Sequence, residues 1–538
     1  MKRRAFLRAA AVAAAGSALP AWSSCSRRTS VTTSGRPAAG DFPLQELTIS
    51  QLQSLMQSGE HTSSSLCELY RNRIEAVDRA GPSLRAVVEM NPDAPEIAAA
   101  LDEERRSRGP RGPLHGIPIM LKDNIDTADR MVTSAGSLAL ASNVAQRDAF
   151  IVQGLREAGA VIFAKTNLSE WANFRSTRSS SGWSARGGQV LNPYALDRSP
   201  CGSSSGSAVA VAANLCAAAV GTETDGSVIC PSSATGIVGI KPTLGLLSRS
   251  GIIPIAHSQD TAGPMARTVA DAAALLGAMT GVDEHDPATR SQKAHPDYTA
   301  FLDPGGLEGM RIGVARNFLG FHEKVDALID DVVEVLKAGG ATVVDPADIA
   351  TKGEYGDSEY EVLLYEFKED LNKYLSQTGP DVPVRTLADL IEFNEAHREE
   401  EMPYFGQEIF IAAQEKGPLT DIAYIEALSK NHRLTRDEGI DATLREHQLD
   451  AIMAASGGPA WCIDLITGDH FLGGSSSPAA VAGYPNITVP AGFVHGLPVG
   501  VSFFGTAYAE PTLIRIAYAY EQASKSRRVP ELKQSLFA

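Results

Sequence analysis

Two clusters of glycine and serine lie close together in residues 199–231, which read SPCGSSSGSAVAVAANLCAAAVGTETDGSVICP. Glycine and serine at this density are costly in a folded chain unless the backbone must bend sharply or present its N–H groups. The Ala-rich stretch between the clusters predicts a helix followed by a buried strand. Such an element would fix both loops relative to one sheet, so the pattern indicates a functional site.

The residue types in these loops suit hydrolysis by a nucleophile. A hydrolase needs a nucleophile, a base that activates it, and N–H donors for the oxyanion of the tetrahedral intermediate. Lys122 is a base only if it is buried, because its pKa must fall from ~10.4 to about 7, which costs about 4 to 5 kcal/mol. A structural lysine in a salt bridge is the alternative. The second cluster contains a turn with a serine hydroxyl and consecutive N–H groups: Thr224, Asp225, Gly226 and Ser227.

Short apolar runs alternate with helical stretches around these residues and along most of the chain. The run at 117–121 ends abruptly at Lys122. This alternation predicts an α/β fold with a largely buried sheet. It predicts strands at 117–121, 160–164, 309–315 and 341–344, and helices at 49–58, 63–80, 150–158 and 325–338.

Composition and charge exclude several classes of protein. The chain has 538 residues, of which 43% are hydrophobic and 21% charged, as in ordinary globular proteins. Its net charge is -16 and no block of Lys and Arg follows the N-terminal segment, so nucleic acid is not an expected partner. Residues 355–446 are charged and helical in period. They predict a helical layer or cap within a single large domain, 42–538.

The first 24 residues predict a signal peptide. They carry Lys2, Arg3, Arg4 and Arg8, no acidic residue, and an Ala-rich apolar run at 9–19. The run is shorter than the ~20 residues that a permanent membrane span needs. The string RRAFLR resembles a twin-arginine signal. We expect an exported protein, periplasmic or secreted, with a flexible leader at 25–41 in which Cys25 stands where a lipoprotein cysteine could sit; a cytoplasmic Ala-rich tail is the alternative.

The cysteines and histidines show no metal-ligand spacing. The sequence has six cysteines and eleven histidines, without a CxxC pair, so we expect neither a metal nor another cofactor. Five cysteines follow Cys25, and an odd number cannot all pair. We expect these five to be free, buried residues that act as small hydrophobes in preference to a disulfide framework: Cys67, Cys201, Cys216, Cys230 and Cys462.

Five ordered blocks of the sequence resemble the amidase-signature family, and together they cover most of the chain. The resemblance implies the amidase-signature fold, a large mixed β-sheet covered by helices on both faces, and hydrolysis of carboxamides without a metal. The blocks are LHGIPIMLKDNIDT (114–127), AKTNLSEWA (164–172), the signature itself (200–243), SQDTAGPMARTVADAAALL (258–276) and GYPNITVPAGFVHGLPVGVSFFG (483–505).

The resemblance also implies residue roles. The family's catalytic lysine falls on Lys122, its bridging serine on Ser203 and its nucleophile on Ser227. A cis peptide bond is implied between Gly202 and Ser203. The implied mechanism has neutral Lys122 taking a proton through Ser203 while Ser227 attacks the carbonyl and forms an acyl-enzyme. Backbone N–H groups of residues 224–227 would hold the oxyanion.

Some residues depart from the usual family pattern. The first cluster is CGSSSG where GGSSGG is usual, and the second is TETDGSVI where TDTGGSIR is usual. Asp225 therefore brings a carboxyl group into the oxyanion turn. These departures, together with GWSARGGQ at 182–189, resemble bacterial peptide amidases, which remove the C-terminal amide from peptide amides. We expect a peptide amide or a related small amide as the substrate.

Other interpretations stay open. Residues 202–206 also match GxSxG, which would make Ser204 the nucleophile, although a polar stretch precedes it where a buried strand is needed. Within the family, an acylamidase on aryl or fatty amides is the main rival. A subunit of the tRNA-dependent amidotransferase is opposed by the export signal and by the absence of a basic stretch. An exported, non-catalytic binding protein is the remaining class, and the oligomeric state is open.

Overall fold

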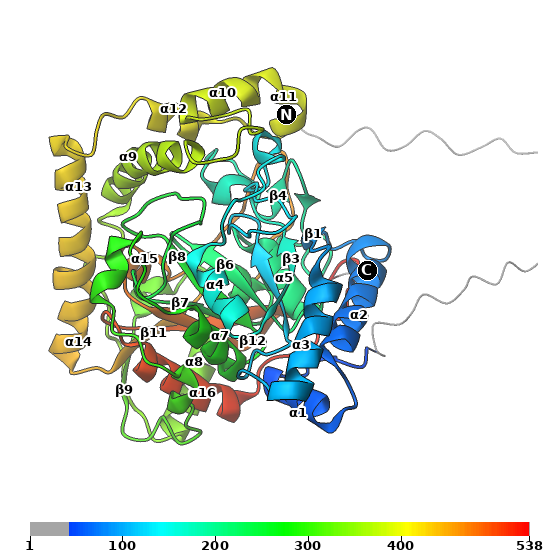
Figure 1. Ribbon diagram of the computed structural model, residues 1–538. Coiled ribbons are helices and arrows are strands. Elements are labelled where there is room, and N and C mark those ends of the chain that lie inside the picture. The colour runs from blue at the N-terminus through cyan, green and yellow to red at the C-terminus, as the bar shows by residue number, and fades with distance from the viewer. Residues whose placement is uncertain (1–41, 537–538) are drawn as a thin grey trace, which may run out of the picture. The chain divides into compact units, whose positions relative to one another are not determined.

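An 11-stranded mixed sheet runs through residues 42–536, the part of the chain that the computed structural model describes (Figure 1). Its strand order is β1-β3-β2-β6-β8-β7-β12-β13-β11-β9-β10. The strands are β1 (Val87–Met90), β2 (Pro118–Lys122), β3 (Val161–Thr166), β6 (Ala218–Glu223), β7 (Val238–Lys241), β8 (Thr261–Ala266), β9 (Arg311–Val314), β10 (Thr342–Val344), β11 (Ala451–Ala455), β12 (Asn486–Val494) and β13 (Leu497–Phe504), with β4 (Trp183–Ser184) and β5 (Gly188–Gln189) as a separate hairpin.

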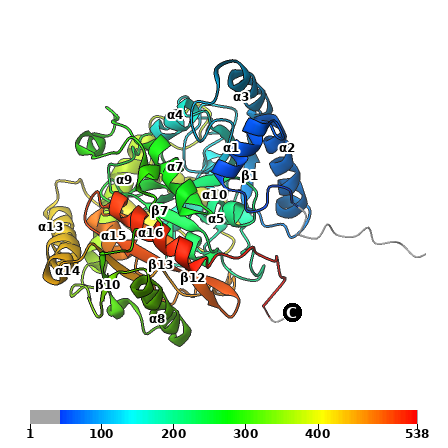
Figure 2. The same cartoon turned by 90° about the horizontal axis from the view of Figure 1, so that it is seen from below.

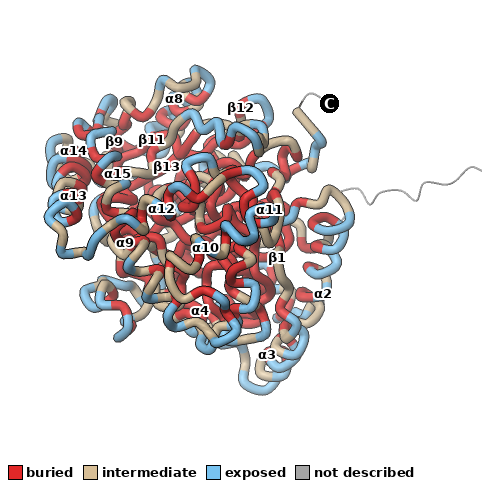
Figure 3. The backbone as a smooth tube through the Cα atoms, turned by 90° about the horizontal axis from the view of Figure 1, so that it is seen from above, coloured by how far each residue is buried: buried red, intermediate tan, exposed pale blue. Residues whose placement is uncertain are grey.

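Parallel and antiparallel neighbours both occur in the sheet, as expected for the α/β class. Strand β2 is parallel to β3 and to β6, whereas β8 is antiparallel to β6 and β7. All residues of β2, β3 and β6 are buried, which explains why their sequences are continuous apolar runs instead of alternating ones. Figure 3 shows the buried backbone concentrated in the interior of the molecule, with the exposed stretches around its rim.

Helices cover both faces of the sheet. Helices α4, α7, α16 and α8 contact one another in that order, and Figure 2 shows α7, α16 and α8 across the near side. Helices α5 and α6 contact each other and pack on β6 and β7. The helices outside residues 355–447 are α1 (Ile49–Ser58), α2 (Ser63–Arg73), α3 (Ala94–Arg108), α4 (Phe150–Glu157), α5 (Ser205–Ala212), α6 (Ile229–Ala234), α7 (Val269–Met279), α8 (Glu323–Ala338), α15 (Ser477–Ala482) and α16 (Glu510–Ser524), with the short turns η1 (Ile74–Arg79), η2 (Leu138–Leu140), η3 (Glu170–Asn173), η4 (Pro287–Ser291), η5 (Tyr298–Phe301) and η6 (Arg316–Phe318).

The strands and helices predicted from hydrophobic periodicity are confirmed. The helix expected at 49–58 is α1, and the strand expected at 117–121 is β2. The helix expected at 63–80 is divided into α2 and η1, because the chain widens into a π-helical turn after Arg73. The Ala-rich stretch between the two Gly/Ser clusters forms α5 and then β6. Local sequence patterns therefore place both clusters at the ends of ordered elements.

Residues 355–446, predicted as a helical layer, fold mainly into helices. They pack through a shared apolar cluster on the sheet and the segments around it, here called the sheet domain. Phe367 and Phe410 contact Phe174 and Trp171 of the sheet domain at ring distances of 5.1 and 5.8 Å. The helices are α9 (Gly356–Leu375), α10 (Leu387–Ala396), α11 (Arg398–Glu401), α12 (Glu408–Gln414), α13 (Ile422–His432), η7 (Arg433–Ile440) and α14 (Asp441–His447). In Figure 1, α9 to α12 lie across the top of the molecule, and α13 and α14 lie along its left edge.

A buried ion pair joins this layer to the sheet domain. The Arg175 guanidinium lies 2.9 Å from Glu170 and 3.9 Å from Glu401, and all three side chains are fully buried. Arg175 also donates to the Glu401 carbonyl oxygen at 2.5 Å. Burial raises the pKa of both glutamates, and the positive charge of Arg175 opposes that rise.

Replacing Arg175 with methionine should lower the free energy of unfolding by about 3 kcal/mol, because Glu170 and Glu401 would lose the cation between them. Urea denaturation followed by circular dichroism measures the change. Arg398→Met is the matched control, since the Arg398–Glu395 pair is exposed and should contribute nothing measurable. If both variants had the same urea midpoint of unfolding, the buried ion pair of Arg175 would not be what holds the helical layer in place.

The predicted signal peptide (1–24) and the leader with Cys25 (25–41) lie outside the described residues. Within the described part of the chain, no helix is long and apolar enough to cross a membrane.

Candidate active site

The candidate residues meet where β2 and β6 end. These strands are parallel neighbours with Leu121 opposite Val220, so Lys122 at the end of β2 reaches Thr222 near the end of β6. The turn at 224–227 follows β6 directly. In open α/β sheets, binding sites lie outside the carboxyl ends of the parallel strands. The order of the strands therefore places the lysine and both Gly/Ser loops at one edge.

Lys122 is fully buried and hydrogen-bonded to two residues. Its Nζ lies 2.7 Å from Ser203 Oγ, 2.8 Å from Thr222 Oγ1 and 3.2 Å from the Thr222 carbonyl oxygen. Burial lowers the pKa of Lys122 to about 7, and the negative charges of Asp260 and Glu223 oppose that shift. An amine with this pKa is present in both its protonated and its neutral form near neutral pH. The neutral form can accept a proton, as a general base must.

Two other fully buried lysines show what distinguishes Lys122. Lys165 donates to the Ile125 carbonyl oxygen and to Thr133 Oγ1, and Lys241 donates to the Pro242 carbonyl oxygen. Burial lowers the pKa of both. Neither is hydrogen-bonded to a serine, whereas Lys122 is. A low pKa alone therefore does not distinguish the three buried lysines, whereas the contact with Ser203 sets Lys122 apart from the other two.

The two serines assigned by resemblance lie on adjoining segments. The Ser204 N–H donates to the Ser227 carbonyl oxygen at 3.1 Å, which holds the loop of Ser203 beside the turn of Ser227. The peptide bond between Gly202 and Ser203 is cis, as the resemblance implied. Both serine side chains are buried, with Ser227 the more accessible at 7% exposed against 0%. The structure thus brings Lys122, Ser203 and Ser227 to one edge of the sheet.

The hydroxyl of Ser204, the alternative nucleophile, makes two hydrogen bonds to the backbone of β6. Its Oγ donates to the Thr222 carbonyl oxygen at 3.0 Å and accepts from the Thr222 N–H at 3.1 Å. The side chain is completely buried against β6. This geometry argues against a nucleophile elbow at residues 202–206.

The turn after β6 presents its backbone N–H groups. Gly226 has a φ of 77°, in the left-handed region that favours glycine. The N–H groups of Val228 and Ile229 both donate to Glu223 Oε2, at 2.8 and 2.9 Å. Those of residues 225–227 donate to no group within residues 42–536. Residues 225–227 therefore have consecutive free N–H donors, and they are three of the four positions, 224–227, that the sequence assigned to an oxyanion hole.

Asp225 lies in this turn and is partly accessible to solvent. Its Oδ1 accepts from Ser476 Oγ at 2.6 Å, and burial raises its pKa. Glu359 of α9 is a nearby acidic neighbour whose pKa is raised to about 8 by burial and by the charge of Asp225. Gln259 donates to Glu359 Oε1 at 3.0 Å and to the Thr224 carbonyl oxygen at 3.2 Å. The helical layer therefore contributes a carboxyl group to the surroundings of the turn.

Asp123 and Asn124, which directly follow Lys122, have different roles. Asp123 accepts from Ser134 and from Arg186, so it braces a turn. Asn124 Nδ2 donates to Thr222 Oγ1 at 2.9 Å, and it therefore acts on Lys122 through that hydroxyl. Thr222 was not predicted as a site residue, although it belongs to the TETDGSV cluster. Its role depends on the pairing of β2 with β6, which no local pattern encodes.

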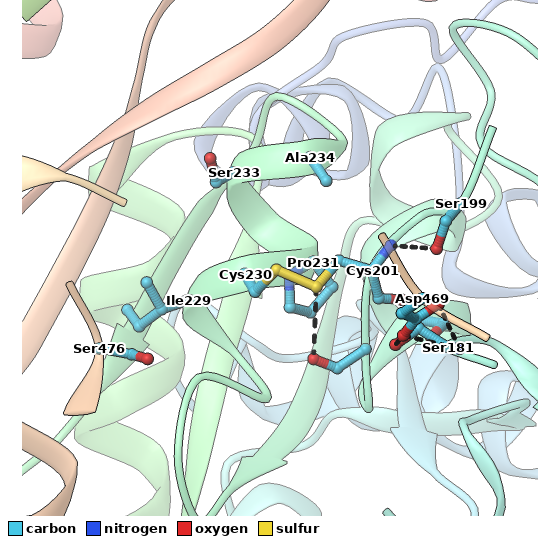
Figure 4. Close-up of a disulfide and its surroundings, with 12 residues drawn as sticks. Ser181, Ser199, Cys201, Ile229, Cys230, Pro231, Ser233, Ala234, Asp469 and Ser476 are labelled. Atoms are coloured by element: carbon cyan, nitrogen blue, oxygen red, sulfur yellow. Dashed lines mark hydrogen bonds between the residues drawn. A yellow bond between two sulfur atoms is a disulfide. The ribbon is translucent and has the colours of Figure 1, made fainter. Parts of the chain in front are cut away.

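The expectation of free cysteines is wrong for two of the five. Cys201 and Cys230 form a disulfide, with Cα atoms 5.9 Å apart and a sequence separation of 29 (Figure 4). Folding brings the loop before α5 against the start of α6, so two distant cysteines become neighbours. The sequence signal was their position: each lies within three residues of an assigned serine. The three other cysteines of the described chain are free. Cys67 and Cys216 are buried as expected, whereas Cys462 is exposed, so the expectation of burial is wrong for it.

A cavity of about 950 Å³ borders the surroundings of Lys122. Its walls include Asn124, Thr222 and Asp260, but neither Ser203 nor Ser227. Thr224, the first residue of the turn after β6, also lines it, and most of the remaining wall comes from α9, from residues 147–153 and from loops at 249–257 and 282–288. The cavity thus reaches Thr222, a hydrogen-bond partner of Lys122, and the first residue of the turn that contains Ser227.

One group in the described chain has donor atoms close enough to hold a metal ion: His257, Glu366 and Asp370. His257 Nδ1 lies 2.8 Å from Asp370 Oδ2, and Glu366 accepts from Tyr424 at 2.7 Å. Neighbouring carboxylates favour the protonated form of His257 and raise its pKa, against the effect of burial. The group is therefore explained as an ion-pair cluster.

Comparison with known proteins matches nearly the whole chain. The sequence profile of the family Amidase matches residues 66–514. A probable amidase of Arabidopsis thaliana is 42% identical over 501 residues, which are 91% of this chain and 92% of that protein. A putative amidase of Schizosaccharomyces pombe is 38% identical over 534 residues, 92% of this chain and 88% of that protein. The crystal structure of native peptide amidase from Stenotrophomonas maltophilia superposes with a TM-score of 0.88 at 54% identity, covering 91% of this chain and 99% of that one.

Proposed function

The chain belongs to the amidase family, and on that basis we propose that it removes the C-terminal amide from peptides, with Ser227 as nucleophile, Ser203 as proton bridge and Lys122 as base. One observation carries the catalytic part: the buried Lys122 amine lies 2.7 Å from the Ser203 hydroxyl, next to a turn with free N–H groups. The substrate part is supported by the 54% identity with the peptide amidase of Stenotrophomonas maltophilia.

Acylation uses the hydrogen bonds around Lys122. A neutral amine has two N–H groups and one lone pair. The N–H groups donate to Thr222, and the lone pair accepts the Ser203 proton. Ser203 in turn takes the proton of Ser227, whose Oγ forms a bond to the carbonyl carbon of the amide. The oxyanion that results is held by the N–H groups of residues 225–227.

The same relay completes the turnover. Lys122 returns its proton through Ser203 to the leaving nitrogen, the C–N bond breaks, and ammonia departs from the acyl-enzyme. Water then attacks the ester carbonyl and gives a proton to the relay, the ester bond to Ser227 breaks, and the relay returns that proton to Ser227 Oγ. The net reaction converts a carboxamide and water into a carboxylate and ammonium, so no further reactant is needed.

Ammonia release from peptide amides tests this proposal. Wild-type enzyme is incubated with a set of peptide amides, with the matched free-acid peptides, and with aryl anilides of the same acyl groups. We expect ammonia from the peptide amides alone. Cleavage of anilides or fatty amides without cleavage of peptide amides would overturn the substrate assignment in favour of an acylamidase. Failure of all amides to react would overturn the enzyme assignment for this chain.

We also propose that the enzyme is exported through the twin-arginine-like string at its N-terminus. The Cys201–Cys230 disulfide supports this, because disulfides form and persist in oxidising compartments and are rare in the cytosol. Replacing Arg3 and Arg4 with lysine should retain amidase activity in the cytoplasmic fraction. Lys2→Arg is the control that leaves the arginine pair intact. Unchanged export of the double variant would contradict the proposal.

A further inference from the structure

We propose that the Cys201–Cys230 disulfide is a positioning device for catalysis, which fixes the loop of Ser203 against the segment of Ser227. The inference rests on the function proposed for these two serines. Cys201 precedes Ser203 by two residues and Cys230 follows Ser227 by three. The bond therefore closes a covalent ring through both serines, α5 and β6.

The other restraints on the relative placement of the two serines are hydrogen bonds, among them the two between Ser204 Oγ and the Thr222 backbone. The Ser204 N–H bond to the Ser227 carbonyl oxygen links their backbones at 3.1 Å. Lys122 holds Ser203 from the side of β2, but it has no hydrogen bond to Ser227. A proton relay needs donor and acceptor within about 2.6 to 3.2 Å. The disulfide adds a covalent restraint to this distance.

The surroundings of Cys201 make the restraint stiff. Its N–H donates to Ser199 Oγ at 3.1 Å, and its carbonyl oxygen accepts from Ser205 Oγ at 2.6 Å. Its φ of 58° lies in the left-handed region that favours glycine. Cysteine therefore occupies a position where a residue without a side chain would fit the backbone better. Figure 4 shows the sulfur bridge between this loop and the first turn of α6.

The bridge is accessible enough to be tested chemically. Cys201 is buried, but Cys230 is partly exposed. Tris(2-carboxyethyl)phosphine reduces a disulfide with one water molecule: the phosphorus is oxidised to the phosphine oxide, the S–S bond breaks, and each sulfur gains a proton. Cys462 is an exposed thiol in the described chain, so Cys462→Ser removes it from the background, and peptide mapping then identifies alkylation at Cys201 and Cys230.

The experiment compares oxidised and reduced Cys462→Ser enzyme after folding is complete. Thiols are counted by alkylation and mass spectrometry, folding is followed by circular dichroism, and kcat and KM are measured with a peptide amide. A misplacement of about 1 Å at a reacting centre lowers the rate roughly 100-fold, and we expect a fall in kcat of about that size. KM should change little, the circular dichroism spectrum should persist, and oxidised glutathione should restore kcat.

Variants separate positioning from stability. Cys201→Ser, Cys230→Ser and the double variant should lose the same factor in kcat, since each removes the same bond. Cys201→Gly relieves the left-handed backbone and should recover thermal stability relative to Cys201→Ser without recovering kcat. Reduced enzyme that stays folded and keeps wild-type kcat would overturn the proposal, and so would full activity of a folded double variant.

The two proposals fail in different ways. Oxidised enzyme that releases no ammonia from any peptide amide contradicts the proposed function. Oxidised and reduced enzymes that are equally active support the function and contradict the role of the disulfide. A serine-directed probe provides a second readout, since its rate of labelling at Ser227 should fall with reduction in the same proportion as kcat.

Discussion

Replacing Ser227 with alanine should abolish ammonia release, with a fall in kcat of roughly 10⁶-fold when the nucleophile of such a relay is removed. Ser227 lies in the turn whose N–H groups are free, and no acyl-enzyme can form without its hydroxyl. The side chain is small and lies at a turn, so the variant should fold. Ammonia release and labelling by a serine-directed probe both measure the loss.

Ser204→Ala is the matched control for Ser227→Ala. The Ser204 hydroxyl is bonded only to the backbone of Thr222 among described residues, so its removal should lower stability and leave most of the turnover in the folded enzyme. Ser203→Ala should resemble Ser227→Ala more closely, because it interrupts the path to Lys122. Loss of activity in Ser204→Ala with activity kept in Ser227→Ala would make Ser204 the nucleophile.

Replacing Lys122 with methionine should lower kcat by about 10³-fold or more, since general-base catalysis contributes about 10²- to 10⁴-fold. Methionine fills the buried space without an amine. Lys165→Met is the matched control: Lys165 is also fully buried on a neighbouring strand, but its amine bonds to Ile125 and Thr133 and not to a serine. The control should lose stability and keep the kcat of the folded fraction.

The pH profile of the wild type gives an independent readout of Lys122. Burial lowers the pKa of this amine to about 7, and only the neutral form accepts the proton. kcat should therefore rise with pH through about 7 and reach a plateau above it, falling tenfold per pH unit on the acid side. Lys122→Met should lose this step. A wild-type rate that is constant from acidic to alkaline pH would contradict the role of the lysine.

The double variant Lys122→Met/Ser227→Ala tests whether the residues act as one unit. Residues of a relay are not additive, so the double variant should be no slower than Ser227→Ala alone. A further fall in rate would show that Lys122 contributes to a reaction that does not pass through Ser227.

Periodicity predicted the elements of the fold, because helices and strands that bury one surface repeat with a fixed spacing in sequence. Helix α1 and strand β2 were found to within one residue at each end. The order of the strands was not predictable in this way. Strands β2 and β6 are neighbours although about a hundred residues separate them, and the sequence contains no local signal for their pairing.

The candidate site was predicted in its residue types and only in part in its contacts. The Gly/Ser clusters and Lys122 were visible as motifs, and the family resemblance supplied the assignment of Ser203 and Ser227. The partners of Lys122 were missed, since Thr222 and Asn124 are ordinary residues until strand pairing places them beside the amine. The role proposed for Lys122 requires a low pKa, and burial in the folded chain lowers the pKa of this amine.

The class of fold, the two loops and the family can all be recognised in the amino-acid sequence, because they depend on local patterns and on ordered motifs. Which distant groups meet is visible only in the folded chain. Cys201 and Cys230 were expected to be free thiols, yet they pair because α5 and β6 fold back on each other. Arg175 likewise meets Glu401 across more than two hundred residues. Contacts of this kind depend on chain topology, which residue spacing does not encode.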